Sequence, residues 1–226
     1  MPTLLAIETS TPAGSVALLN NDKVIGEVQT NNLETHAATL LPAIDQLLSS
    51  TNTNINSIDG IAVSIGPGAF TGLRVGISTA QGLAQTLNIP IYTIPTLEAL
   101  AHSASISEKP IFATLDARKD EIYGALFKWK NEELIRLIPE AILTPADWIT
   151  LLLKKISQDS FIIVGNGYLR YKDLFDNTFG NQLGVTVPVD SMNPSSAKVG
   201  LIGLNHISSS LKKDATNIKA LYLRQF

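Results

Sequence analysis

Glycine-containing turns and polar strand ends are the parts of this 226-residue sequence whose residue types could do chemistry. The longest such stretch is Gly66-Pro67-Gly68-Ala69-Phe70-Thr71-Gly72-Leu73-Arg74-Val75-Gly76, which joins an apolar run to a segment with helical spacing. Glycines let a ligand approach the backbone, so one interpretation is a phosphate cradle at a helix N-terminus. The spacing matches neither Gly-x-Gly-x-x-Gly nor the Gly-Lys-Ser/Thr ending of a P-loop. The structural alternative is better supported, because Gly72, Gly76 and Ala80 share one side of the helix and would form a smooth stripe that admits another helix.

Polar side chains at the end of the first apolar run form a second candidate site. Glu8, Thr9, Ser10 and Thr11 place a carboxylate and three hydroxyls directly after residues 4–7. Such groups can hold a phosphate or a metal-bound water. Ordinary turn chemistry explains them about as well, so both interpretations stay open.

The second half of the chain has a comparable place. Asp116 follows the apolar run 111–115, but the turn 116–121 contains no glycine, and its bulky side chains would crowd out a phosphate. Gly165 and Gly167 follow another buried-type run, where they would pass a base or ribose closely or simply form a tight turn. The candidates for a vestigial nucleotide site are therefore Glu8, Thr9, Ser10, Asp116, Gly165 and Gly167.

The sequence lacks the residues that several other kinds of functional site require. The chain has no cysteine, which excludes disulfides, thiolate metal sites and a cysteine nucleophile. No Gly-x-Ser-x-Gly elbow of a serine hydrolase occurs. The histidines, His36, His102 and His206, lack the spacing of three or four residues that delivers two imidazoles from one helix to a metal. A histidine metal site is therefore not expected.

The charge balance restricts the choice of partner. Seventeen Lys and Arg against twenty Asp and Glu give a net charge of −3, which argues against nucleic-acid binding through a broad basic face. A local patch is left open at Arg118 and Lys119, which would meet an acidic partner or a tRNA phosphate, or form a solvated hairpin tip. Only 16% of the residues are charged, a low proportion that fits a surface with a face for a partner.

The elements that must position these residues follow from hydrophobic periodicity. Short apolar runs separated by turn residues predict a three-strand meander over residues 4–7, 16–19 and 24–28. The later segments alternate between strand and helix patterns and predict an α/β fold whose sheets have mixed direction. The further predicted strands are 58–65, 91–94, 111–115, 122–127, 134–138 and 161–164, and the predicted helices are 33–48, 71–87, 145–156 and 195–209, followed by an extended tail over 219–224.

Both halves begin with antiparallel strands and continue into helices, which predicts two lobes. Interrupted periodicity near residues 100–109 places the boundary there, giving an N-terminal lobe of residues 1–104 and a C-terminal lobe of residues 105–226, whose last segment returns toward the first lobe. The chain enters an apolar run directly after Thr3, so we expect no signal peptide and a cytoplasmic location. No apolar run reaches the length of a membrane span.

These residues together resemble the TsaB family, also called YeaZ, which is the dimerisation subunit of the bacterial tRNA threonylcarbamoyladenosine complex. The resemblance spans nearly the whole chain. Its specific parts are Leu5-Ala6-Ile7-Glu8-Thr9-Ser10, His36 through Leu41-Pro42, the Gly66 to Gly76 stretch, Asp116-Ala117-Arg118 with Glu121-Ile122-Tyr123, and Leu221-Tyr222-Leu223-Arg224. It implies the two-lobed fold of actin, heat-shock ATPases and sugar kinases, with a mixed sheet and helices in each lobe.

The resemblance also implies a function. A member of this family is expected to be a non-catalytic scaffold that binds the catalytic subunit TsaD and supports threonylcarbamoyl transfer to the adenosine beside the anticodon of tRNAs reading codons that begin with A. The expected partners are TsaD, TsaE in the larger complex, a second copy of the chain when TsaD is absent, and tRNA only through the complex. No cofactor and no membrane contact are expected.

One departure from the related TsaD pattern supports a non-catalytic role. TsaD carries a His-x-x-x-His pair that ligates a metal after the strand that follows its glycine-rich helix. In this chain Thr96 and Leu100 hold the matching positions, and leucine cannot ligate a metal. Glu98 lies between them without such partners.

The resemblance places the partner interface on the two helices of the first lobe, which would form a four-helix bundle with the same helices of another chain. The expected interface residues are His36, Leu40, Leu41, Ile44, Leu47, Phe70, Thr71, Gly72, Leu73, Arg74, Gly76, Ile77 and Ala80. The alternative function is an active ATPase, kinase or metallopeptidase of the same fold, suggested by Glu8, Thr9, Asp116 and the glycine turns.

Overall fold

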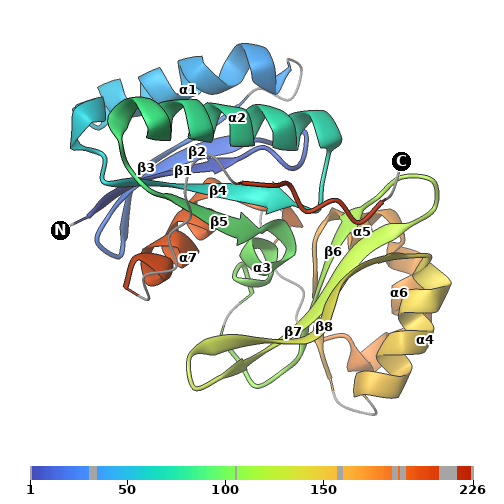
Figure 1. Ribbon diagram of the computed structural model, residues 1–226. Coiled ribbons are helices and arrows are strands. Elements are labelled where there is room, and N and C mark those ends of the chain that lie inside the picture. Colours follow the sequence, from blue (N-terminus) through green and yellow to red (C-terminus); the bar gives the residue numbers. More distant parts are fainter. Residues whose placement is uncertain are drawn as a thin grey trace. The chain divides into compact units, whose positions relative to one another are not determined.

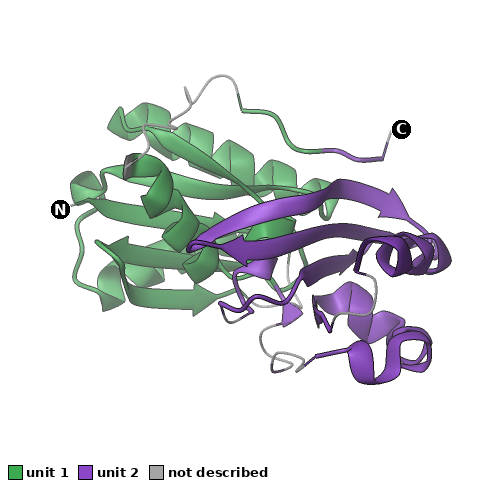
Figure 2. Cartoon of the chain, turned by 90° about the horizontal axis from the view of Figure 1, so that it is seen from below, with its two compact units in different colours: residues 1–99, 194–221 green, residues 100–193, 222–226 purple. Residues whose placement is uncertain are grey.

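The computed structural model describes residues 2–30, 35–104, 106–156, 160–184, 188, 192–208 and 218–224. The chain forms two compact units, residues 1–99 with 194–221 and residues 100–193 with 222–226 (Figure 2). The sequence places the boundary after residue 104 and predicts a C-terminal lobe of residues 105–226 whose last segment returns toward the first lobe. In the structure the boundary lies after residue 99, and residues 194–221 belong to the first unit, where the helix within them packs on the sheet.

The first unit is built on a five-stranded sheet of order β3-β2-β1-β4-β5. Strands β1, β2 and β3 form the predicted antiparallel meander, while β4 pairs parallel with β1 and β5 parallel with β4. The mixed direction predicted from the sequence is therefore confirmed. The strands are β1 (Thr3–Glu8), β2 (Ser15–Asn20), β3 (Lys23–Gln29), β4 (Gly60–Gly66) and β5 (Ile91–Pro95).

Helices cover both faces of this sheet (Figure 1). Helices α1 (His36–Ser50) and α2 (Phe70–Leu87) lie side by side on one face, and α7 (Ser196–Ser208) packs on the other. Strand β1 is buried along its whole length because its side chains alternate between these two layers. Leu5 and Ile7 pack with the core beneath α1 and α2, whereas Leu4 and Ala6 pack with α7.

The second unit holds a four-stranded sheet of order β8-β7-β6-β9, formed by β6 (Ile111–Asp116), β7 (Ile122–Lys130), β8 (Glu133–Leu143) and β9 (Ile162–Val164). Its aromatic core joins the sheet to α4 (Pro145–Ile156), α5 (Asn166–Arg170) and α6 (Lys172–Phe179). Trp148 is fully buried there and donates from Nε1 to the carbonyl oxygen of Ile122 over 3.1 Å.

Three short helices were not predicted from the sequence. α3 (Thr96–Ala101) follows β5, and α5 and α6 follow β9, where only a turn was expected. The short 3-10 helices are η1 (Ile55–Ser57) and η2 (Gly180–Gln182). The predicted ends at Leu33 and Ser209 lie outside the described residues. Among the described residues, no helix combines the length and the hydrophobicity needed to cross a bilayer.

Candidate functional site

The paired helices α1 and α2 present two different surfaces, one toward their own sheet and one toward solvent. The inner surface holds six of the residues expected at a partner interface, which is a correction to that expectation. They are buried in the core of the first unit because they supply the apolar stripes that cover the sheet. These residues are Leu40, Ile44, Leu47, Leu73, Ile77 and Ala80.

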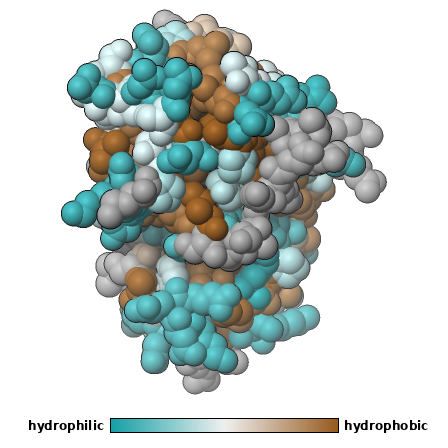
Figure 3. Space-filling view, turned by 60° about the vertical axis from the view of Figure 1, so that its left-hand side comes forward, coloured by the Kyte–Doolittle hydropathy of each residue, from teal (hydrophilic) through white to brown (hydrophobic). Residues whose placement is uncertain are grey.

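The solvent side of the same helices keeps the other part of the expected interface. Leu41 is 56% exposed on α1 and Phe70 is 36% exposed at the start of α2. The guanidinium of Arg74 lies 3.7 Å from the centre of the Phe70 ring, a cation–π contact. We call this surface the outer face and define it by Ala38, Leu41, Pro42, Asp45, Phe70, Thr71, Arg74 and Ser78, all exposed. Figure 3 shows a face of the molecule on which hydrophobic residues reach the surface in patches between hydrophilic ones.

The glycine stripe of α2 faces the chain's own β1 strand, so the expectation that it admits a partner helix is wrong for this structure. A methyl group on Gly72 would lie 2.1 Å from the carbonyl oxygen of Thr9, and one on Gly76 would lie 2.2 Å from Thr9 Oγ1. Thr9 Oγ1 in turn donates to the carbonyl oxygen of Gly72 over 2.8 Å. The two glycines are therefore small because α2 crosses the end of β1 closely.

The turn before α2 is closed in the same way. Gly66 has a φ of 111°, which favours glycine, and a methyl group on Gly68 would lie 2.4 Å from the carbonyl oxygen of Ser10. The backbone N–H of Ala69, at the N-cap position, already donates to that oxygen over 2.7 Å. The turn thus binds the end of β1, which disfavours the interpretation as a phosphate cradle.

Glu8 lies at the centre of a buried polar cluster at the end of β1. Its Oε1 accepts the backbone N–H of Ser10 over 2.5 Å, and its Oε2 accepts the hydroxyl of Ser64 from β4. Burial raises the pKa of Glu8 above its ordinary value of 4.5, while the hydrogen bonds from Ser10 and Ser64 and the charge of His36 partly oppose the shift. Ser64 was missed at the sequence level, although a lone serine within an apolar strand was a visible signal.

We expect the Glu8→Gln variant to show the ionisation of this carboxyl. A carboxyl whose pKa is raised in the folded state favours folding while protonated; this contribution is complete below about pH 4.5 and is lost as the pH rises through the folded-state pKa. Glutamine cannot ionise. The free energy of unfolding of the parent chain should therefore fall, relative to that of Glu8→Gln, as the pH rises from about 4.5 to 8 in urea titrations. A difference between the two proteins that stays constant with pH would contradict the expectation.

The candidates in the second unit also contact their own backbone. Gly165 has a φ of 109°, and a methyl group there would lie 1.8 Å from the carbonyl oxygen of Thr114; one on Gly167 would lie 3.0 Å from the carbonyl carbon of Leu115. The backbone N–H of Asp116 donates to Asn166 Oδ1 over 2.9 Å. The glycines thus let α5 start directly against β6, and they do not line an open ribose site.

The hairpin tip after Asp116 is held by two arginines, of which the sequence analysis named only Arg224, as part of the resemblance. Arg118, Lys119 and Asp120 are exposed, and all three have positive φ. Arg170 from α5 forms an ion pair with Asp116 at 3.1 Å, and Arg224 from the C-terminal segment pairs with Glu121 and donates to the carbonyl oxygen of Ala117. Both arginines lie far from the hairpin in sequence, so no local pattern predicts that they contact it.

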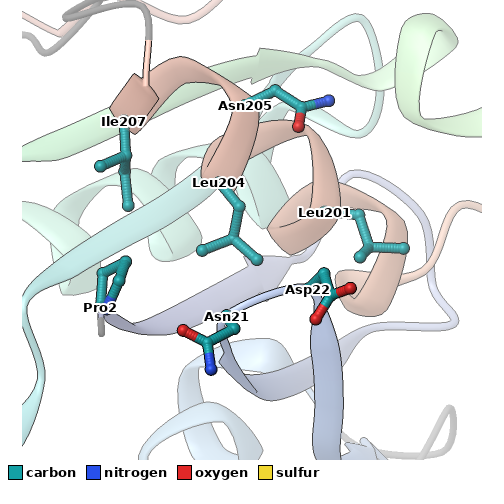
Figure 4. Close-up of a pocket in the computed structure, with 7 residues that line it drawn as sticks. All are labelled: Pro2, Asn21, Asp22, Leu201, Leu204, Asn205 and Ile207. Atoms are coloured by element: carbon teal, nitrogen blue, oxygen red, sulfur yellow. The ribbon is translucent and has the colours of Figure 1, made fainter. Parts of the chain in front are cut away.

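A pocket of about 250 Å³ lies in the first unit, between α7 and the turn that joins β2 to β3 (Figure 4). Leucine and isoleucine side chains of α7 form one side, and Asn21 and Asp22 from the β2–β3 turn form the other. This volume is below the roughly 300–1,000 Å³ of most small-molecule sites. None of the candidate residues lines it.

The two positions that match the His-x-x-x-His pair of TsaD lie on α3, a packed helix. Thr96 and Leu100 are four residues apart at α3 and are both fully buried. Within the described ranges, no three His, Cys, Asp or Glu residues are grouped so that they could hold a metal ion.

Comparisons with known proteins place this chain among proteins of tRNA threonylcarbamoyladenosine biosynthesis. Residues 23–223 match the family model described as TsaD, tRNA N6-adenosine threonylcarbamoyltransferase. The tRNA threonylcarbamoyladenosine biosynthesis protein TsaB of Bacillus subtilis is 30% identical over 225 residues, covering 98% of this chain and 94% of the relative.

Solved structures give the same result. YeaZ from Pseudomonas aeruginosa has a TM-score of 0.80 at 28% identity and covers 99% of this chain and 100% of that chain. The ROK hexokinase of Thermus thermophilus is similar in fold alone, with a TM-score of 0.52, 9% identity, and coverage of 92% and 99%, which confirms the predicted sugar-kinase-like fold. The chain therefore belongs to the TsaB (YeaZ) family of tRNA threonylcarbamoyladenosine biosynthesis proteins.

Proposed function

We propose that this chain is the non-catalytic subunit that binds a TsaD-type catalytic subunit through the outer face of α1 and α2. In this role it supports threonylcarbamoyl transfer to the adenosine beside the anticodon of tRNAs that read codons beginning with A. The observation that carries the proposal is the exposure of Leu41 and Phe70 on two neighbouring helices, because large apolar groups on one face favour a protein partner. The outer face has one acidic and one basic residue, Asp45 and Arg74, so apolar contact would dominate binding.

The state of the candidate nucleotide residues supports a role without catalysis. Four glycines at the candidate turns lie so close to the chain's own backbone that an added methyl group would have too little space. They are Gly68 and Gly72 in the first unit and Gly165 and Gly167 in the second. Glu8 is fully buried and satisfied by Ser10 and Ser64. Groups that are engaged in packing are not available to a ligand. We also propose that TsaE is a partner in a larger assembly, and that the chain forms a homodimer when TsaD is absent.

Replacement of Leu41 by glutamate tests the outer face. The side chain is mostly exposed, so the fold should tolerate the change, whereas a charge in an apolar interface should weaken binding of the organism's own TsaD by about tenfold or more. Isothermal calorimetry or a sizing column with purified TsaD measures this. Leu153→Glu is the matched control, because Leu153 is 48% exposed on α4 in the second unit and lies outside the outer face. Equal affinities of the two variants would remove the proposed interface.

The alternative, an active ATPase, kinase or metallopeptidase, has a direct test. Calorimetry of the isolated chain with ATP and magnesium, together with an assay of released phosphate and a metal analysis, should give neither tight binding nor turnover. Turnover by the chain alone, lost in Glu8→Gln, would replace the scaffold proposal by an enzymatic one.

A further inference from the structure

The first turn of α1 is attached to the fold without a usual helix cap. Thr35 at the N-cap position makes no side-chain capping hydrogen bond, and the first turn carries no acidic residue. A side-chain contact is made there by His36, whose Nε2 lies 2.8 Å from the carbonyl oxygen of Thr11. Because a carbonyl oxygen can only accept, Nε2 carries the proton and donates.

The imidazole of His36 lies in a slot bordered by two glycines. A methyl group on Gly14, in the turn between β1 and β2, would lie 2.7 Å from Cε1 and 2.9 Å from Nδ1 of the ring. A methyl group on Gly72, in the first turn of α2, would lie 3.1 Å from Cδ2. The ring therefore fits between the β1–β2 turn and α2 because both neighbours lack a side chain at that point.

The same turn also holds α2. The carbonyl oxygen of Ser10 accepts the backbone N–H of Ala69, and the Thr9 hydroxyl donates to the carbonyl oxygen of Gly72. Residues 9–11 thus contact the beginnings of both helices, and the His36 side chain connects α1 to them.

From this geometry we propose that His36 is a positioning residue that fixes the first turn of α1 against the first turn of α2 and so sets the spacing of the two helices that carry the outer face. The consequence for binding rests on the proposed function. A partner that contacts both helices binds more tightly when their spacing is fixed beforehand, since less conformational freedom is lost on association.

A second polar neighbour of the ring agrees with this role. Nδ1 of His36 and Oγ1 of Thr30 are buried and have no hydrogen-bond partner among the described residues. Both lie beside Gly14, since the position of a methyl group there is 2.9 Å from Nδ1 and 2.7 Å from the hydroxyl oxygen. The slot therefore places a second polar group of the chain, the Thr30 hydroxyl, beside the ring.

Hydrogen exchange of the free, full chain tests the positioning role without any partner. His36→Leu keeps much of the volume and removes the donor, whereas His36→Gln keeps an N–H donor at about the position of Nε2. We expect amide exchange at residues 39–41 and 43 of α1 and 73–77 of α2 to become about tenfold faster in His36→Leu and to stay within about threefold of the parent in His36→Gln. Gln46→Leu, at an exposed position of α1, is the control and should leave these amides unchanged.

Two outcomes would overturn the proposal: unchanged exchange in His36→Leu, or exchange in His36→Gln as fast as in His36→Leu. If His36→Leu does not fold, Gly14→Ala replaces it, because the added methyl group displaces the ring from the slot and should accelerate the same amides. In the double variant Gly14→Ala with His36→Gln, we expect amide exchange to be accelerated as much as in Gly14→Ala alone, because both changes act on one contact. A fully additive acceleration would count against the positioning role.

Binding of TsaD separates this inference from the proposed function. We expect His36→Leu to weaken binding about tenfold and His36→Gln about threefold or less. If Leu41→Glu leaves binding intact while His36→Leu accelerates exchange, the outer face is not the interface and the positioning role stands. If Leu41→Glu abolishes binding while exchange in His36→Leu equals that of the parent, the positioning role fails and the interface stands.

Discussion

Gly72→Ala is expected to destabilise the first unit by about 3 kcal/mol or more, because the new methyl group has no space. It would lie 2.1 Å from the carbonyl oxygen of Thr9, which is backbone at the end of a fully buried strand and cannot move as a flexible side chain would. Relief requires α2 to shift away from β1, which also stretches the hydrogen bond from the Thr9 hydroxyl to Gly72. Urea unfolding followed by far-ultraviolet circular dichroism measures the loss.

Gly82→Ala, on the same helix, is the matched control and should act in the opposite direction. Nothing lies within 4 Å of the added methyl group, and alanine is the better helix former, so a gain of about 0.4–1 kcal/mol is expected. Both substitutions are glycine to alanine inside α2 and differ only in what the methyl group meets. If Gly72→Ala were as stable as the parent, the close crossing of α2 over β1 would not exist, and an open stripe for a partner would again be the better interpretation.

The stripe of small residues on α2 illustrates what helical spacing does and does not determine. The spacing of Gly72, Gly76 and Ala80 correctly predicts one side of one helix and a close neighbour. It cannot identify that neighbour, because a strand of the same chain and a helix of another chain both require small residues at the contact. The same ambiguity affects Leu40 and Leu41, which are adjacent in sequence, although Leu40 is buried and Leu41 is exposed.

Most long elements could be predicted, since an apolar run or a helical period of ten residues or more carries its own signal. The helix α4 has the predicted bounds, Pro145–Ile156, and α2 differs from its prediction by one residue. Short helices such as α3 and α5 contain too few residues to show a period. The return of α7 to the first sheet depends on apolar contacts with Leu4 and Ala6 at the other end of the chain, which no local pattern reports.

The candidate site was predicted as a set of positions but not as a set of contacts. Glu8 is paired with Ser64, 56 residues away, and Glu121 with Arg224, 103 residues away. Sequence motifs identify which residues are unusual for their element, and folding decides whether each meets a ligand or its own chain. In this protein most of the unusual glycines and the carboxyl of Glu8 meet their own chain, so the surface left for a partner is the outer face.

Gly165→Ala is expected to have the largest effect on the second unit, at about 4 kcal/mol or more, enough to prevent that unit from folding stably. Its methyl group would lie 1.8 Å from the carbonyl oxygen of Thr114 and 2.8 Å from the carbonyl carbon, both in β6, an inner strand of the sheet. The φ of 109° adds strain for any residue with a side chain. Trp129 and Trp148, the two tryptophans of the chain, both lie in the second unit, so tryptophan fluorescence during urea unfolding reports on this unit.

The Gly180→Ala variant distinguishes the effect of backbone strain from the effect of the steric clash at Gly165. Gly180 also has a positive φ, 47°, but nothing lies within 4 Å of an added methyl group. Its substitution should therefore cost only the backbone strain, about 1–3 kcal/mol, and leave a cooperative fluorescence transition at a lower urea concentration than in the parent. The excess loss in Gly165→Ala then measures the contact of the β9–α5 turn with β6. An equal loss in both variants would mean that Gly165 is required for its dihedral angle alone, and that the space beside Thr114 is open to a ligand after all.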